Sequence, residues 1–298
     1  MRKDKWIILV NKVNNMKNCL FIILFLAQFV AAQSTKEIRL LVRGDDMGSF
    51  ASANQACIEA ATKGIARSIE VMVPCAWFPE AARLLNENPS IDVGVHLILS
   101  SEWTNCKWRP LTCGKSIVDA NGYFYPLIWT SKEAPGCSLQ EAKWNIEDIE
   151  AEFRAQIETA KKNIHNVTHL STHMICVEWN KELTALVHKL AKEYGLYWNP
   201  DSALENFPRM NVDKDATLEK RIDAFIEAFD KLEAGKTYLF IEHPAYNTPE
   251  MQTIMQKATD RIGKDREYIV KMFTDERVKS AIKAKGIHLV SYADIIRM

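Results

Sequence analysis

Short apolar runs rich in β-branched residues alternate along the chain with longer segments in which apolar residues recur at helical spacing. This order is typical of a parallel sheet with helices packed against it. Seven runs fit strands, and seven such strands favour a closed or nearly closed barrel. The predicted strands span residues 38–42, 68–73, 93–97, 168–171, 195–198, 237–241 and 287–290. We therefore expect residues 36–298 to form a single α/β domain.

The clearest helical period lies in residues 146–164, where an apolar stripe opposes a set of charged side chains. The stripe consists of Ile146, Ile149, Phe153, Ile157 and Ala160. The charged set, expected to face solvent, consists of Glu147, Glu150, Glu152, Lys161 and Lys162. Residues 215–232 and 275–284 show the same pattern, so we expect all three helices to be scaffold rather than site.

Residues 19–30 form an apolar run that follows Lys12 and Lys17 and precedes Ala31 and Ala32. The run is too short for a membrane-spanning helix, which needs about 20 residues. This order is typical of a signal peptide. We expect residues 1–33 to be a signal-peptide region, with Met16 an alternative natural start, and the mature chain to be secreted or periplasmic without stable membrane insertion. A retained membrane anchor is the alternative.

Lys and Arg together number 38, as do Asp and Glu, so the formal net charge is zero. Without a net field to attract a polyanion, we expect no nucleic-acid partner. The composition leaves a homo-oligomer open.

The cysteines after residue 33 contain no Cys-x-x-Cys pair, so a thiolate zinc site is not expected. They are Cys57, Cys75, Cys106, Cys113, Cys137 and Cys176. Cys106 and Cys113 lie in one loop and suggest a disulfide, with free buried thiols as the alternative.

Polar residues of catalytic type stand at the ends of four predicted strands. Asp45 and Asp46 follow the first strand, and His96, His173 and His243 mark the ends of the third, fourth and sixth. Taken singly, the Asp pair is typical of a solvated turn and each histidine of a core residue. Because the carboxyl ends of parallel strands meet at one mouth of a barrel, polar residues at four such ends together predict a shared site. Adjacent carboxylates there need a cation or a proton to relieve their repulsion.

Asp46, His96 and His173 belong to separate strand–helix units, which fits ligands brought together by the fold. One carboxylate and two imidazoles suit Zn²⁺ or another divalent metal and leave positions for water and substrate. The sequence therefore predicts one divalent metal ion, Mg²⁺ or Zn²⁺, at this mouth.

The same positions carry a resemblance to the YdjC-like carbohydrate deacetylases, the family of the chito-oligosaccharide deacetylases. The matching stretches are residues 44–48 (Gly-Asp-Asp-Met-Gly), 94–97 (Gly-Val-His-Leu), 172–173 (Thr-His) and 243–244 (His-Pro). Residues 116–123 resemble a loop of the family, and residues 265–267 and 287–296 resemble its tail. The motifs occur in the family's order and cover most of the chain.

The resemblance implies a distorted seven-stranded β/α (TIM-like) barrel that removes N-acetyl groups from amino sugars. By the same resemblance Asp46, His96 and His173 hold the metal, Asp45 is the general base and His243 the general acid. The implied partner is an N-acetylated oligosaccharide or glycoconjugate.

One departure from the family concerns the third motif. Many relatives continue with further histidines, whereas His173 is followed by Met174, Ile175 and Cys176. The ligand is retained, but the surrounding pocket changes, so the usual substrate of relatives need not be the substrate of this chain.

Side chains of adjacent residues in a regular strand point to opposite faces. Asp45 and Asp46 can therefore share one site only if the backbone leaves strand geometry there, which Gly44 and Gly48 make plausible. The alternative role for Asp45 is to orient His96 or His173 through a ring N–H.

The loop after His96 is rich in aromatic residues, and flat apolar rings are suited to stacking on sugars. Trp103, Trp108 and Arg109 are the candidate substrate contacts, with a small loop core as the alternative for the rings. Two other functions stay open: another metal-dependent hydrolase, such as an esterase or phosphoesterase, and a non-catalytic carbohydrate-binding protein.

Overall fold

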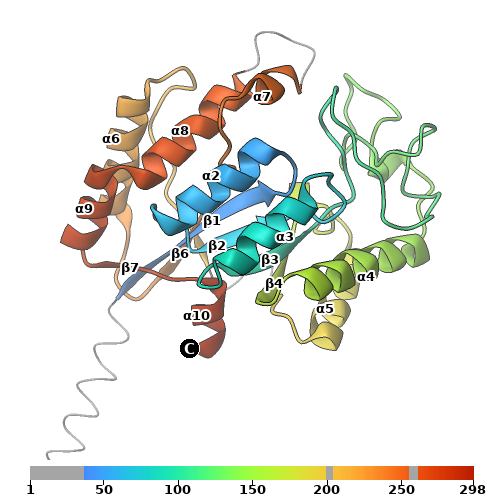
Figure 1. Cartoon of the computed structure of the whole chain (residues 1–298), viewed down its shortest axis with the longest axis horizontal. Coiled ribbons are helices and arrows are strands. Elements are labelled where there is room, and N and C mark those ends of the chain that lie inside the picture. The colour runs from blue at the N-terminus through green and yellow to red at the C-terminus, as the bar shows by residue number, and fades with distance from the viewer. Residues whose placement is uncertain (1–36, 199–203, 255–260) are drawn as a thin grey trace, which may run out of the picture.

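A parallel sheet of seven strands forms the centre of the molecule in the computed structural model, which describes residues 37–198, 204–254 and 261–298 (Figure 1). The strands are β1 (Ile38–Met47), β2 (Ser68–Val71), β3 (Asp92–Leu97), β4 (Val167–Thr172), β5 (Glu205–Asn206), β6 (Thr237–Glu242) and β7 (Ile287–Leu289). Their order is β4-β3-β2-β1-β6-β5, and β7 also pairs with β1. The predicted parallel α/β architecture is confirmed.

β1 is the longest strand and organises the sheet. One of its edges pairs with β6 through residues Arg39 to Gly44. The other edge pairs first with β7, through Ile38 to Leu40, and then with β2, from Arg43 onward. The strand that ends in the two aspartates is therefore held on both sides.

The prediction of a strand at residues 195–198 is wrong in extent. Gly195 ends the preceding helix with a left-handed φ of 66°, which leaves little chain for a strand. Within this segment only Tyr197 pairs, through an isolated bridge to His169 of β4. The fifth strand is the two-residue β5, and among the described residues no ladder joins β4 to β5, so the barrel is open there.

The helices pack side by side as an outer layer. Their bounds are α2 (Ala51–Thr62), α3 (Phe78–Glu87), α4 (Ile146–Asn163), α5 (Lys181–Tyr194), α6 (Leu218–Ala228), α7 (Pro249–Thr253), α8 (Ile262–Thr274), α9 (Glu276–Ala284) and α10 (Tyr292–Arg297). Short 3₁₀ helices lie at Leu139–Glu141, His173–Ile175 and Phe229–Lys231. Contacts run from α6 through α8, α2, α3 and α4 to α5, while α10 packs against β4 (Figure 1).

The three predicted helices correspond to α4, α6 with its 3₁₀ extension, and α9. In α4 the apolar stripe is buried as expected from Ile149 to Ala160, with Phe153 and Ile157 fully inaccessible, while Ile146 is half-buried. Glu152 is a correction, because it is also fully buried. Its carboxylate accepts hydrogen bonds from Thr112 N at 3.0 Å and Thr112 Oγ1 at 2.7 Å, so it anchors the loop between β3 and α4.

The described cysteines are all free, so the Cys106–Cys113 disulfide that the shared loop suggested is wrong. Free buried thiols, the alternative, are found at Cys57, Cys75 and Cys176, whereas Cys106 is half-buried and Cys113 exposed.

The expected signal-peptide region, residues 1–33, lies outside the described residues. Among the helices that the structure describes, none has the length and apolar character needed to span a membrane.

Substitution of Gly48 tests the conformation of the turn that follows the two aspartates. Its φ is 97°, and a Cβ there would lie 2.7 Å from the carbonyl oxygen of Met72. Gly136 also has a positive φ, 74°, but nothing lies within 4 Å of its Cβ position. We expect Gly136→Ala to cost about 1 kcal/mol of unfolding free energy and Gly48→Ala roughly 2–4 kcal/mol, since only the latter adds a backbone clash. Urea unfolding of both variants measures the difference, and equal costs would contradict the assigned clash.

Candidate metal and catalytic site

The backbone leaves strand geometry where the two aspartates stand. Asp46 has a left-handed φ of 68°, and the register between β1 and β2 shifts between Gly44 and Met47. Asn54 fixes the turn, because its Oδ1 accepts a hydrogen bond from Gly48 N at 2.7 Å. Adjacent carboxylates that would point to opposite faces of a regular strand are therefore brought to one mouth.

Asp46, His96 and His173 come together at the carboxyl ends of β1, β3 and β4. Each offers one ligand atom, and these atoms lie within 4.8 Å of one another. His173 Nδ1 lies 3.2 Å and His96 Nε2 3.8 Å from Asp46 Oδ1. All three side chains are buried, and Asp46 Oδ1 makes no hydrogen bond of regular geometry, although His173 Nδ1 lies next to it. A buried carboxylate oxygen that faces two imidazoles fits a divalent metal ion.

Neighbouring charges shift the pKa values of Asp46 and His173. Burial opposes ionisation of Asp46, but His243, Arg266 and His173 hold its pKa well below the usual range. Burial likewise disfavours the charged form of His173, yet Glu102 and Asp46 raise its pKa to about 10. Without a metal the pair is thus a carboxylate and an imidazolium, and a cation that binds there takes the place of a proton.

His96 titrates in the opposite direction. Burial, together with the neighbouring charge on His173, puts the pKa of His96 well below its ordinary value. The ring is therefore neutral at physiological pH and has one nitrogen free to bind a metal.

Asp45 is held by Arg43 through two hydrogen bonds. Arg43 Nε donates to Oδ1 at 2.8 Å and Nη2 donates to Oδ2 at 3.0 Å, in a buried pair. Asp45 Oδ2 also lies 3.6 Å from His96 Nε2. It therefore borders the triad.

In both His96 and His173, the ring nitrogen that points away from Asp46 forms a hydrogen bond with a residue other than Asp45. His96 Nδ1 lies 2.8 Å from Ser171 Oγ, and His173 Nε2 lies 3.2 Å from Glu102 Oε2. The alternative in which Asp45 orients one of these rings through its outer N–H does not hold in this geometry.

His243 opens onto a pocket of about 290 Å³ beside the triad. The pocket is lined by Trp103, Arg221, Glu242, His243, Ile262, Asp265, Arg266 and Ile269. Burial lowers the pKa of His243, against the opposing charge of Asp46. Burial also raises the pKa of the neighbouring Glu242 to about 7. Glu242 can therefore exchange protons near neutral pH, and His243 beside it stays neutral there.

Arg266 and Glu102 belong to this site but were not assigned to it from the sequence. Arg266 Nη2 donates to Asp46 Oδ2 at 2.9 Å, and its guanidinium lies 5.3 Å from the ring centre of Trp103. Arg266 lies within residues 265–267, which resemble the family's tail, and that was its only signal. Glu102 lies in an irregular loop, where no periodicity could single it out.

The three candidate substrate-binding residues lie in different places in the structure. Trp103 lines the pocket beside His243. Trp108 is buried in the loop core, where its Nε1 donates to Ser100 O at 2.7 Å. Arg109 also engages the loop, with Nη1 donating to Asn121 O at 2.7 Å. For Trp108, the alternative of a small core within the loop therefore holds.

The residues that follow His173, where the third motif departs from the family, have an unusual backbone conformation. Met174 and Ile175 both have left-handed conformations, with φ of 52° and 49°. Such a φ is uncommon for a non-glycine residue and strained for a β-branched one. Met174 Sδ lies 3.3 Å from Ser100 Oγ, and Ile175 is 54% exposed. An apolar side chain thus projects from the turn directly after His173.

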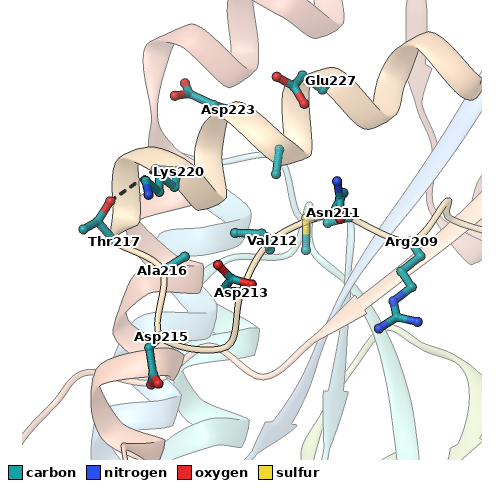
Figure 2. Close-up of a pocket in the computed structure, with 12 residues that line it drawn as sticks. Arg209, Asn211, Val212, Asp213, Asp215, Ala216, Thr217, Lys220, Asp223 and Glu227 are labelled. Carbon is teal, nitrogen blue, oxygen red and sulfur yellow. Dashed lines mark hydrogen bonds between the residues drawn. The ribbon is translucent and has the colours of Figure 1, made fainter.

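A larger groove lies away from the triad (Figure 2). It measures about 1,040 Å³ and runs between α6 and residues 209–217. Its lining is mostly polar and includes Asp213, Asp215, Lys220, Asp223 and Glu227. None of the triad, Asp45 or His243 lines it, whereas His243 and Arg266, the partner of Asp46, line the smaller pocket.

Known proteins resemble this chain along most of its length. A carbohydrate deacetylase of Enterococcus faecalis is 26% identical over 86% of this chain and 98% of its own. A chitooligosaccharide deacetylase of Yersinia enterocolitica is 30% identical over 53% of this chain and 57% of its own. A crystal structure from Enterococcus faecalis V583, described as a cellobiose-phosphate cleavage protein, is 23% identical and has a TM-score of 0.69, covering 87% of this chain and 99% of its own. That structural likeness establishes the fold.

A family model described as YdjC-like protein matches residues 39–284. This range includes both aspartates, His96, His173, His243 and Arg266. The chain therefore belongs to the YdjC-like protein family.

Proposed function

We propose that this chain is a metal-dependent carbohydrate deacetylase that removes N-acetyl groups from an amino-sugar oligosaccharide or glycoconjugate. The observation that carries the proposal is the buried Asp46, His96 and His173 triad with Asp45 and His243 beside it. Relatives named carbohydrate deacetylase and chitooligosaccharide deacetylase support the substrate class.

Asp46, His96 and His173 would hold one divalent metal, Mg²⁺ or Zn²⁺. When bound, such an ion would polarise the acetyl carbonyl and lower the pKa of a bound water to about 7. The chain supplies a buried, preformed set of donors, in which Asp46 Oδ1 already faces the two rings.

Asp45 is the residue best placed to receive a proton from the attacking water. Arg43 fixes the direction of its carboxylate through two hydrogen bonds, and Oδ2 remains 3.6 Å from His96 Nε2 at the edge of the triad. A carboxylate fixed in direction needs little reorganisation when the proton arrives, which is how a positioned base accelerates a reaction.

His243 would give a proton to the departing sugar nitrogen. Burial lowers its pKa, so the ring of the free enzyme is neutral at pH 7 and must gain a proton before it can donate one. Trp103 lines the same pocket, where it is largely buried and packs against Arg266, so the part of its ring that borders the pocket would contact the sugar.

We also propose that the protein acts outside the cytoplasm, as the apolar run at residues 19–30 suggests.

Acetate release tests the proposed reaction. We expect the purified chain to release acetate from N-acetylated chito-oligosaccharides, to lose this activity with a chelator and to regain it with Mg²⁺ or Zn²⁺. Acetate esters and phosphate monoesters belong in the same panel. Hydrolysis of only these esters would favour the other metal hydrolase, and sugar binding without turnover would favour a carbohydrate-binding protein.

Substitution of the proposed ligands tests the metal site itself. We expect Asp46→Asn and His173→Ala to lower metal affinity by more than about 100-fold, beyond the loss typical of outer partners. His288→Ala is the control, because that imidazole is 56% exposed and lies outside the site. Calorimetric titration with metal gives the affinities, and circular dichroism verifies the fold. Stoichiometric metal retained in both ligand variants would rule out this ligand set.

His243→Ala separates proton transfer from metal binding. Because His243 is not among the proposed ligands, we expect metal affinity to be retained while kcat falls by roughly 10²–10⁴-fold. Steady-state kinetics with a saturating metal concentration measures the loss. An unchanged kcat would show that another group, such as Glu242, supplies the proton.

A further inference from the structure

A chain of buried polar contacts lies beneath the triad. Ser171 Oγ lies 2.8 Å from His96 Nδ1 and donates its hydrogen to Glu70 Oε2 through a short hydrogen bond. The other oxygen of Glu70 lies 2.7 Å from His169 Nε2. Glu70 and His169 are fully buried, and Ser171 is 3% exposed. These three residues come from β2 and β4, and the described mechanism leaves them without a role.

Gly94 makes the contact between β2 and β4 possible. In the sheet register Gly94 of β3 stands between Glu70 of β2 and His169 of β4. A Cβ at Gly94 would lie 2.1 Å from Glu70 Oε2 and 2.4 Å from His169 Nε2. Two side chains from strands that are not neighbours therefore meet across the bare backbone of the strand between them.

The direction of the hydrogen bonds follows from the number of protons available. Burial opposes ionisation of Glu70, but His169 and Arg43 hold its pKa below the ordinary value, so it is a carboxylate and can only accept. Ser171 has one hydroxyl hydrogen, which goes to Glu70. Toward His96 the serine oxygen can then only accept, so His96 Nδ1 must carry a hydrogen.

The opposite nitrogen of a neutral imidazole has no hydrogen when Nδ1 carries one. That nitrogen, His96 Nε2, faces Asp45 Oδ2 and Asp46 Oδ1 at 3.6 and 3.8 Å. If Ser171 donated to His96 instead, Nε2 would carry the hydrogen and could not bind a metal.

We propose that Glu70, acting through Ser171, fixes His96 as the Nδ1–H tautomer and so presents the lone pair of Nε2 to the metal. Glu70 and Ser171 are positioning residues in this scheme, and His169 holds Glu70 in place from β4. The inference rests on the proposed function only in taking a metal ion as what His96 binds. The tautomer of the ring exists before any metal binds.

The tautomer of His96 is measurable in the metal-free full chain by two-bond ¹H–¹⁵N correlation spectra with ¹⁵N-labelled histidine. A His96→Gln spectrum assigns the ring. We expect the wild-type chain to show protonated Nδ1 and bare Nε2, and Ser171→Ala to lose this preference. Ser138→Ala is the matched control, because Ser138 is also a buried serine that donates to a carboxylate, Glu141 Oε2, at 2.6 Å.

Zn²⁺ affinity by calorimetry is the second measurement. We expect Ser171→Ala and Glu70→Gln to weaken Zn²⁺ binding by about 10–100-fold, and Ser138→Ala to leave it unchanged. A wild-type His96 with hydrogen on Nε2 would overturn the proposal, as would a Ser171→Ala chain that folds and keeps both the wild-type tautomer and affinity. Failure of the wild-type chain to bind metal would instead count against the proposed function.

Discussion

Two neighbouring carboxylates are buried at the end of β1, and each is balanced by a cation from a different part of the chain. Arg43, on the same strand, binds Asp45 with two hydrogen bonds. Arg266, from α8, binds Asp46 through a single oxygen. Burying charge is costly unless it is paired, so these cations are required for the aspartates to reside there. The packing of α8 against α2, which lets Arg266 reach Asp46, thus follows partly from the electrostatics of the site.

The difference between the two aspartates has a functional consequence. Both oxygens of Asp45 are engaged by Arg43, which fixes the carboxylate without leaving it unpartnered. Asp46 Oδ1 makes no hydrogen bond of regular geometry and faces the rings of His96 and His173. A buried carboxylate oxygen with only such contacts costs free energy that a bound cation would recover. The geometry therefore distinguishes a carboxylate that Arg43 fixes through both oxygens from one whose Oδ1 faces two imidazoles.

The mouth of the site depends on the loop between β3 and α4, which carries Glu102 and Trp103. Buried polar residues of α4 hold this loop to the sheet. Gln156 accepts from Ile98 N and donates to Ile98 O, each at 3.0 Å, and Glu152 accepts from Thr112. A helix that the sequence suggests is simple scaffold is thus also an anchor for residues at the site. This explains why Glu152, in a charged and apparently solvent-facing position, is fully buried.

The sequence by itself determined the parallel α/β architecture and the strand ends that carry Asp45, Asp46, His96, His173 and His243. Those features depend on local periodicity and on residue types that are uncommon at the ends of apolar strands. Only the tertiary structure decided the left-handed turn at Asp46, the pairing of Arg266 with Asp46 across 220 positions, and the contact of Glu70 with His169 over Gly94. Three further features are visible only in the tertiary structure: the predicted strand at residues 195–198 is a single bridge, Glu152 is buried, and Trp108 lies in the loop core. These outcomes depend on which residues face each other across strands and helices, and local patterns along one chain do not contain that information.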